Sequence, residues 1–394
     1  MRRRSHVHIE LATVLAVAII GLLAMVGCRS TTIRPAGVTG TPGIPRARLV
    51  APAAAGVVAP PAAGAYIGVY RPPAPFDATA LDAYASISPK KPAIVMWYQP
   101  WAETGRNKFD AAACVSLYQR GAIPLLTWEP WDPGKDAGSV KDGSRQTAWR
   151  LANIISGQYD AYIREFAVGV KSVRGPVMIR LMHEMNGDWY PWDGSVNGNS
   201  PQQFVQAWRH VHDIFAKEGV TNATWVWSIN HESVPDTPAN AFAAYYPGDA
   251  YVDWVSMSGF NWGTSSAGTR WRTFDYWFDK PLAYLATLGK PVVLAEFGSV
   301  DNGGDKGAWI LDAYAKVAAQ HPQVKAVVYY DKLERLPTSQ QDWRIESSAR
   351  SLAGYRTAVA SDYFLSAPPA TLASWTASLT LDGWAYLRSL KPIY

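Results

Sequence analysis

The chain has 394 residues, 48% of them hydrophobic and 18% charged, so it can form one large domain or two ordinary ones with a globular core. The formal net charge of +5 misleads, because residues 1–64 hold seven arginines and one acid and leave 30 of the 37 basic and 31 of the 32 acidic residues to the remainder. A nearly neutral folded part gives no electrostatic support to nucleic-acid binding, and we expect no nucleic-acid partner.

Residues 1–28 predict a lipoprotein-type signal peptide or a membrane anchor. The basic start MRRRSHVHIE precedes an apolar run, Leu11 to Gly27, that is long for a signal-peptide core and short for a spanning helix. Met25-Val26-Gly27-Cys28 resembles a bacterial lipobox, in which the cysteine is lipidated. Residues 29–64 are rich in Pro, Ala, Gly and Thr and predict a flexible linker. We therefore expect an extracytoplasmic protein that is tethered to the cell membrane, with plain secretion as the alternative.

From residue 65 onward, apolar runs alternate with helical patterns. The predicted strands are 65–70, 93–98, 123–128, 176–182, 223–229, 252–260, 291–297 and 325–330. The predicted helices are 77–87, 109–121, 149–173, 200–218, 276–288, 306–320 and 344–360.

This alternation predicts an α/β fold, a (β/α)8 TIM barrel, as the domain 65–362. The rival is an open doubly wound sheet, but no glycine-rich nucleotide-binding motif follows any of the strands. Residues 363–394 extend beyond the last helix and are predicted to form a C-terminal appendage of unknown role.

Two predicted strands end in a glutamate. The strand 176–182 is followed by His183 and Glu184, and the strand 291–297 contains Glu296. All strands of a closed parallel barrel open at one face, so the two glutamates should face each other in one cleft. Glycoside hydrolysis requires such a pair. The competing interpretation is that each glutamate is a solvated loop residue.

Other chemistries fit the sequence less well. A zinc motif H-E-x-x-H would need a second histidine where Gly187 stands. Met257-Ser258-Gly259 does not match the G-x-S-x-G motif of esterases. We therefore expect neither a metal nor an organic cofactor.

The stretch RLMHEMNGDW, Arg180 to Trp189, resembles the strand-four signature of glycoside hydrolase family 26, in which a histidine precedes the acid. The resemblance covers about residues 66–360. It implies the barrel fold, Glu184 as acid/base, Glu296 as nucleophile and retention of configuration. It also implies that Trp189 stacks on a sugar.

Further residues at or near strand ends are candidates for substrate binding. We expect Arg180 to support the nucleophile and His183 to contact the reacting sugar or a carboxylate. Trp192 and Trp128 are further candidates, each of which could instead be packing. Asn261 and Trp262, which close the strand 252–260, and Tyr330, at the end of the strand 325–330, complete the set. One departure from the family is Phe260, which stands where members usually carry a tyrosine that hydrogen-bonds the nucleophile.

The predicted function is an endo-β-glycanase that acts as a monomer on β-1,4-mannan. Because the family also contains enzymes that cut mixed-linkage β-glucan and β-1,3-xylan, both remain alternatives. A polysaccharide-binding protein without catalysis is a further alternative, supported by Phe260.

Overall fold

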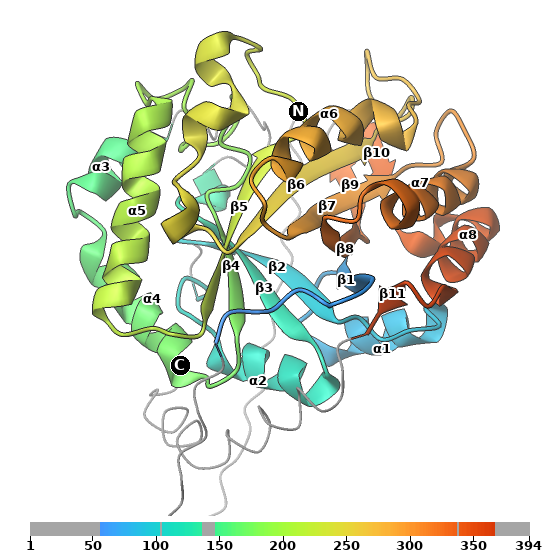
Figure 1. The fold of residues 1–394 in the computed structure, drawn as a ribbon, viewed down its shortest axis with the longest axis horizontal. Coiled ribbons are helices and arrows are strands. Elements are labelled where there is room, and N and C mark those ends of the chain that lie inside the picture. The colour runs from blue at the N-terminus through green and yellow to red at the C-terminus, as the bar shows by residue number, and fades with distance from the viewer. Residues whose placement is uncertain (1–55, 103–104, 136–145, 337–338, 367–394) are drawn as a thin grey trace, which may run out of the picture. The chain divides into compact units, whose positions relative to one another are not determined.

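Eight parallel strands close into a barrel, and helices cover its outer face (Figure 1). The structure is a computed structural model that describes residues 56–102, 105–135, 146–336 and 339–366. The predicted signal peptide, most of the predicted linker and residues 367–394 lie outside the described residues. Within the described residues, no helix is long and apolar enough to cross a membrane.

The eight predicted barrel strands are confirmed. Each strand pairs with the next in chain order, and β1 also pairs with β8, which closes the sheet. Nearly every strand residue is buried, as expected where one face meets the helices and the other fills the barrel. The strands are β1 Ala65–Tyr70, β2 Ile94–Pro100, β3 Ile123–Glu129, β4 Val177–Leu181, β5 Ala223–Asn230, β6 Trp254–Asn261, β7 Val292–Ser299 and β8 Val324–Tyr330.

The helices follow the predicted order, with one correction. The single helix expected at 149–173 is two helices, α3 and α4, because the chain turns at Gly157, whose φ of 84° is the left-handed conformation that glycine tolerates. The predicted cap of α5 is present, since the Ser200 side chain accepts a hydrogen bond from the Gln203 amide. The helices are α1 Ala78–Ile87, α2 Ala111–Arg120, α3 Leu151–Ile155, α4 Asp160–Ser172, α5 Pro201–Lys217, α6 Phe274–Ala286, α7 Lys306–Gln320 and α8 Ala349–Ala360.

Two segments near the predicted domain boundaries pack on the barrel. Val58, in the predicted linker, is buried; its amide donates to Thr224 Oγ1 and its carbonyl accepts from the Trp254 indole, each at 2.8 Å. The short strand β11, Phe364–Leu365, pairs with the start of β1. Parts of both predicted flanking regions therefore belong to the folded body.

An antiparallel hairpin was not predicted. It consists of β9 Leu333–Leu336 and β10 Ser339–Asp342 and follows the C-terminal end of β8. The short segments Pro133–Lys135, Thr147–Trp149, Pro238–Asn240, Phe242–Tyr245, Asp249–Tyr251 and Ile345–Ser347 form 3-10 turns in the loops.

Candidate active site

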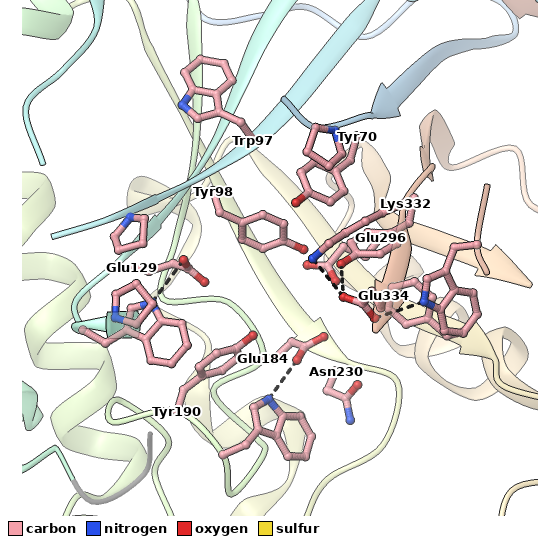
Figure 2. A pocket seen from close by; sticks show the side chains of 18 of the residues that line it. Tyr70, Trp97, Tyr98, Glu129, Glu184, Tyr190, Asn230, Glu296, Lys332 and Glu334 are labelled. Atoms are coloured by element: carbon pink, nitrogen blue, oxygen red, sulfur yellow. Dashed lines mark hydrogen bonds and ion pairs between the residues drawn. The ribbon is translucent and has the colours of Figure 1, made fainter. Parts of the chain in front are cut away.

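A cavity of about 860 Å³ opens at the C-terminal ends of the barrel strands. Glu184, three residues beyond β4, and Glu296, within β7, both line it (Figure 2). A carboxylate oxygen of Glu184, one of Glu296 and a ring nitrogen of His183 lie within 4.8 Å of one another. The two glutamates expected to face each other are therefore brought together by the barrel.

The backbone after β4 is strained in a way that directs Glu184. Met182 and Glu184 have φ values of 45° and 57°, a conformation that costs a non-glycine residue about 1–2 kcal/mol. The Glu184 amide donates to the Ser228 carbonyl of β5 at 2.9 Å, which fixes this turn against the neighbouring strand. Such strain is typical of functional positions.

Arg180 lies beneath the cavity and contacts Glu296 from inside the barrel. Its guanidinium donates to Glu296 Oε1 at 2.5 Å and to the hydroxyls of Ser228 and Ser258 at 2.9 and 2.6 Å. Arg180 is fully buried, and this network satisfies donors that would otherwise be unpaired in the core. This ion pair fixes the position of the Glu296 carboxylate at the floor of the cavity.

The surroundings of Glu184 favour its protonated form. Burial, and secondly the negative charge of Glu296, raise the pKa of Glu184 to about 7, while Arg180 and hydrogen bonds from Ser258 and Trp189 oppose the rise. A carboxylic acid with a pKa near 7 can hold a proton at neutral pH and donate it, as a general acid must.

The aromatic side chains of Trp189 and His183 lie against the carboxylates of Glu184 and Glu296. The Trp189 indole donates to Glu184 Oε2 at 3.0 Å, so this residue contacts the carboxylate in addition to lining the cavity. His183 Nε2 lies 3.2 Å from the Tyr190 hydroxyl and 3.7 Å from Glu296 Oε1. Burial, and secondly Arg180, hold the pKa of His183 well below its usual value, so the ring is neutral.

A third glutamate, Glu129 at the end of β3, was missed by the sequence analysis. It lines the same cavity, accepts a hydrogen bond from the Trp131 indole at 3.3 Å and lies 3.8 Å from His183 Nδ1. Burial raises the pKa of Glu129 to about 8, so its carboxyl is mainly protonated at neutral pH. The sequence signal was the same as for Glu296, a carboxylate at the end of an apolar strand.

The predicted substrate-binding residues divide into two groups. Trp189, Trp262 and Tyr330 line the cavity. Arg180 and His183 lie behind it, in contact with Glu296.

The expectation that Trp128, Trp192 and Asn261 reach the substrate is corrected, because none of them lines the cavity. Trp128 is fully buried and stacks on Phe166 of α4. Trp192 is buried and stacks on Tyr190. The Asn261 side-chain nitrogen donates to Ser299 Oγ, and its Oδ1 accepts from the backbone amides of Gly263 and Arg272.

Phe260 lines the cavity where a family tyrosine was expected. Its ring packs edge to face on Tyr330 and lies against Trp343, with centroids 5.2 and 4.9 Å apart. Among the described residues, the side chain that donates a hydrogen bond to Glu296 is Arg180. Arg180 thus supplies the orienting contact that a tyrosine hydroxyl would otherwise share.

His183, Glu184 and Glu296 are also the described residues that could together hold a metal ion. The Arg180 guanidinium already occupies one oxygen of Glu296, and a divalent cation there would face this positive charge. The residues fit a pair of acid and nucleophile better than a set of metal ligands.

A parallel barrel with one buried carboxylate just beyond strand four and another within strand seven has the layout of a glycosidase. The chain belongs to glycosyl hydrolase family 26, whose sequence model matches residues 73–279. This confirms the resemblance seen in the strand-four stretch.

The relatives carry three kinds of name: endoglucanase, mannan endo-1,4-beta-mannosidase and beta-1,3-xylanase. Endoglucanase H of Acetivibrio thermocellus is 33% identical over 285 residues, which are 72% of this chain and 27% of that protein. Mannan endo-1,4-beta-mannosidase A and B of Caldalkalibacillus mannanilyticus is 33% identical over 131 residues, 32% of this chain and 23% of that protein. The chain therefore spans about a quarter of the length of these relatives.

Solved structures agree with the fold. The catalytic domain of the endo-beta-1,4-mannanase of Bacillus sp. JAMB-750 superposes with a TM-score of 0.58 at 18% identity, covering 79% of this chain and 89% of that one. At this identity the likeness supports the barrel architecture alone.

Proposed function

We propose that the protein is a retaining endo-β-glycanase that uses Glu296 as nucleophile and Glu184 as acid/base. The observation that carries the proposal is the approach of their carboxylate oxygens to within 4.8 Å. Retaining glycosidases hold their two carboxyl groups about 5–5.5 Å apart, whereas inverting enzymes leave about 6.5–9.5 Å for a water molecule.

The local chemistry supports this division of roles. Glu296, beside the Arg180 guanidinium, attacks the anomeric carbon while the proton on Glu184 passes to the departing glycosidic oxygen. Glu184 then accepts a proton from the water that attacks the glycosyl–enzyme ester, and Glu296 is released as a carboxylate.

Two substrates are supported by different observations. β-1,4-Mannan is the substrate that the family resemblance predicts, and several relatives are named mannan endo-1,4-beta-mannosidases. A β-glucan is favoured by Endoglucanase H, whose similarity extends over 285 residues, against 131 for the mannosidase of equal identity. Because substrate choice depends on residues from many strands, we rank β-glucan, with mixed-linkage glucan as its family form, ahead of mannan.

The N-terminal patterns lead us to propose that the enzyme acts outside the cytoplasm. In this proposal, residues 1–28 supply a lipid or hydrophobic anchor, the linker separates it from a monomeric barrel, and the polysaccharide is the partner. The basis is the sequence pattern alone, since residues 1–55 lie outside the described ones.

The test is reducing-end release by the purified protein from mannan, galactomannan, mixed-linkage β-glucan and β-1,3-xylan. We expect release from one polymer, and a loss of at least about a thousandfold in Glu296→Ala, since a removed nucleophile leaves only residual catalysis. NMR of the first product should show the β-anomer. Release that persists in Glu296→Ala, or an α-anomer as first product, would refute the mechanism.

A polysaccharide-binding protein without catalysis is the remaining alternative. It predicts retention in gels that contain one of the polymers, with no reducing ends released from any. The geometry of both glutamates with Arg180 speaks against it, because a binding cleft has no need of a carboxylate held near pKa 7.

A further inference from the structure

A second cavity adjoins the catalytic one. It has a volume of about 460 Å³, and His231 and Glu232, which follow β5, line both cavities. Its opposite wall comes from α6, through Tyr276, Trp277 and Lys280. A chain leaving the catalytic cavity over the end of β5 would enter this hollow.

The wall formed by the β5 loop is held to the loop that carries Glu184. The side-chain nitrogen of Asn186 donates to the backbone carbonyls of Asn230 and Glu232 at 3.2 and 2.9 Å. Its side-chain oxygen accepts from the backbone amide of Asn230 at 2.8 Å. The Val234 amide and the Asn240 side chain both donate to the Asn186 carbonyl. The position of this wall is therefore fixed relative to the candidate acid.

The opposite wall presents an aromatic ring. Tyr276, on the first turn of α6, is 56% exposed. The Arg272 guanidinium lies over the ring at 4.2 Å from its centroid, and Trp277 meets it edge to face at 4.7 Å. Arg272 is in turn anchored by its amide to Asn261 Oδ1 of β6. The ring is thus supported from the protein side.

Polar atoms without partners lie beside this ring. The rings of Trp277 and His231 pack edge to face, and the Trp277 indole nitrogen and His231 Nε2 are buried without a hydrogen-bond partner among the described residues; the nearest carboxylate oxygen to Nε2, Glu232 Oε1, is 3.7 Å away. His231 Nδ1 lies 3.0 Å from Asn230 Oδ1, which makes it the donor nitrogen and leaves Nε2 as an acceptor. Burial lowers the pKa of His231 to about 4, so this acceptor is kept at neutral pH. Buried polar atoms normally find partners, so this donor and acceptor point to a ligand with hydroxyl groups.

We propose that the second cavity is a distal carbohydrate subsite, which binds sugar residues of the same polysaccharide chain away from the bond being cut. The inference rests on the proposed function and deepens it. A supported, exposed aromatic ring offers a flat apolar face to the C–H face of a sugar, and the flanking polar groups match its hydroxyls. The shared lining by His231 and Glu232 makes the occupant a continuation of the bound chain.

Binding, measured without catalysis, tests the inference. The parent is the full chain carrying Glu184→Gln, and the first variant adds Tyr276→Ala to it. Affinity for the polymer is measured by affinity electrophoresis in mixed-linkage β-glucan and in mannan, and affinity for the matching trisaccharides by calorimetry. Ala241→Trp, which adds bulk at an exposed position lining the second cavity, is a second variant that leaves Tyr276 in place.

We expect both variants to lose about fivefold or more in affinity for the polymer, the usual cost of removing an anchoring aromatic contact. The affinity for a trisaccharide, too short to extend from the catalytic cavity into the second one, should change less than twofold. Tyr363→Ala, a partly exposed tyrosine beside β11, and Ala243→Trp, an exposed alanine that does not line the cavity, are the matched controls and should behave as the parent.

Three other results overturn the inference. Unchanged polymer affinity in both variants removes the distal subsite and leaves the proposed function standing. An equal loss for polymer and trisaccharide places the contact within the catalytic cavity. A parent chain that neither binds nor, with Glu184 restored, hydrolyses any polymer of the panel refutes the proposed function, and the distal subsite with it.

Discussion

The proton on Glu184 depends on a few neighbouring groups. Burial and Glu296 raise the pKa of this carboxyl to about 7, and the hydrogen bond from the Trp189 indole acts against them. If Glu184 is the acid, the alkaline limb of the pH profile for kcat/KM should fall as this proton is lost, at a pH near 7.

Trp189→Phe tests this balance. The indole N–H stabilises the ionised carboxylate, so its removal should raise the pKa of Glu184 and move the alkaline limb upward by up to about one pH unit, given about 1.4 kcal/mol per unit. The measurement is kcat/KM between pH 5 and 10. Trp131→Phe is the matched control, because its indole donates to Glu129 instead. A limb that stays in place or moves down in Trp189→Phe would show that Glu184 does not set it.

Glu129 provides a prediction about stability. Its carboxyl has a pKa of about 8 in the folded protein against a usual 4.5, so the folded state holds a proton that the unfolded state releases as pH rises. Stability is therefore fully present below about pH 4.5 and is lost progressively up to about pH 8.

Glu129→Gln cannot ionise, so its free energy of unfolding should gain on that of the wild type as pH rises through this window. The gain is at most about 5 kcal/mol, because each pH unit contributes about 1.4 kcal/mol. Urea unfolding at pH 5, 6.5 and 8 measures it, with the exposed Glu165→Gln as control for the loss of a negative charge. A constant difference between Glu129→Gln and wild type would place the carboxyl in its ionised form throughout.

Among the elements, the loops after β4 and β5 form a single unit because Asn186 joins them. Its side-chain nitrogen donates to two backbone carbonyls and its oxygen accepts from an amide. Asn186 follows Glu184 by two residues, so any loosening of the β5 loop also releases the loop that carries the candidate acid.

Asn186→Asp keeps the acceptor and removes both donors. The Asn230 carbonyl would then face a carboxylate in a buried place, whereas the Glu232 carbonyl still accepts from the Asn230 side chain. We expect a loss of about 1–3 kcal/mol in the free energy of unfolding, the cost of one unsatisfied buried group. Activity should fall with it, as followed by reducing-end release. Asn197→Asp, in the same loop, loses a donor to one carbonyl and should cost less. Equal losses in the two variants would show that Asn186 is not the joint.

The strands were predictable because their residues are apolar on both faces, and the helices because their caps and apolar stripes are local. The split of 149–173 was not predicted because the helical pattern continues on both sides of Gly157, and a single glycine does not by itself show that a helix ends there. Side-chain direction was also missed. In β3, Leu125 belongs to the apolar cluster inside the barrel and Trp128 to the one beneath the helices. The alternation along a strand then sends Glu129 inward and Trp128 outward.

Other parts of the site depend on contacts distant in sequence. The sequence could suggest Glu184 and Glu296, and Arg180 as a support for the nucleophile, but it could not give the hydrogen-bond geometry between Arg180 and Glu296, which are 116 positions apart. The hairpin β9–β10, which brings Glu334 to the cavity, follows β8 without an apolar pattern of its own. Short polar strands such as these are specified by what they pack against, and local sequence therefore gives little sign of them.

For the whole molecule, the two ends of the barrel have different tasks. The C-terminal ends of the strands carry the cavities, while the opposite end is closed in part by Val58, whose backbone bonds to Thr224 and Trp254. We expect this closure to serve stability, so that damage to it leaves the site geometry intact.

Val58→Asp tests this separation. A carboxylate at this buried position would have no partner cation in the described contacts of Val58, and we expect a loss of about 3 kcal/mol or more in the free energy of unfolding. The matched control is Val57→Asp, at a neighbouring residue that is 48% exposed, which should cost no more than about 0.5 kcal/mol. Thermal unfolding measures both, and kcat/KM well below the transition should equal that of the wild type. If the two variants unfold alike, the segment before β1 does not close the barrel; if Val58→Asp lowers kcat/KM while still folded, the two ends of the barrel are coupled.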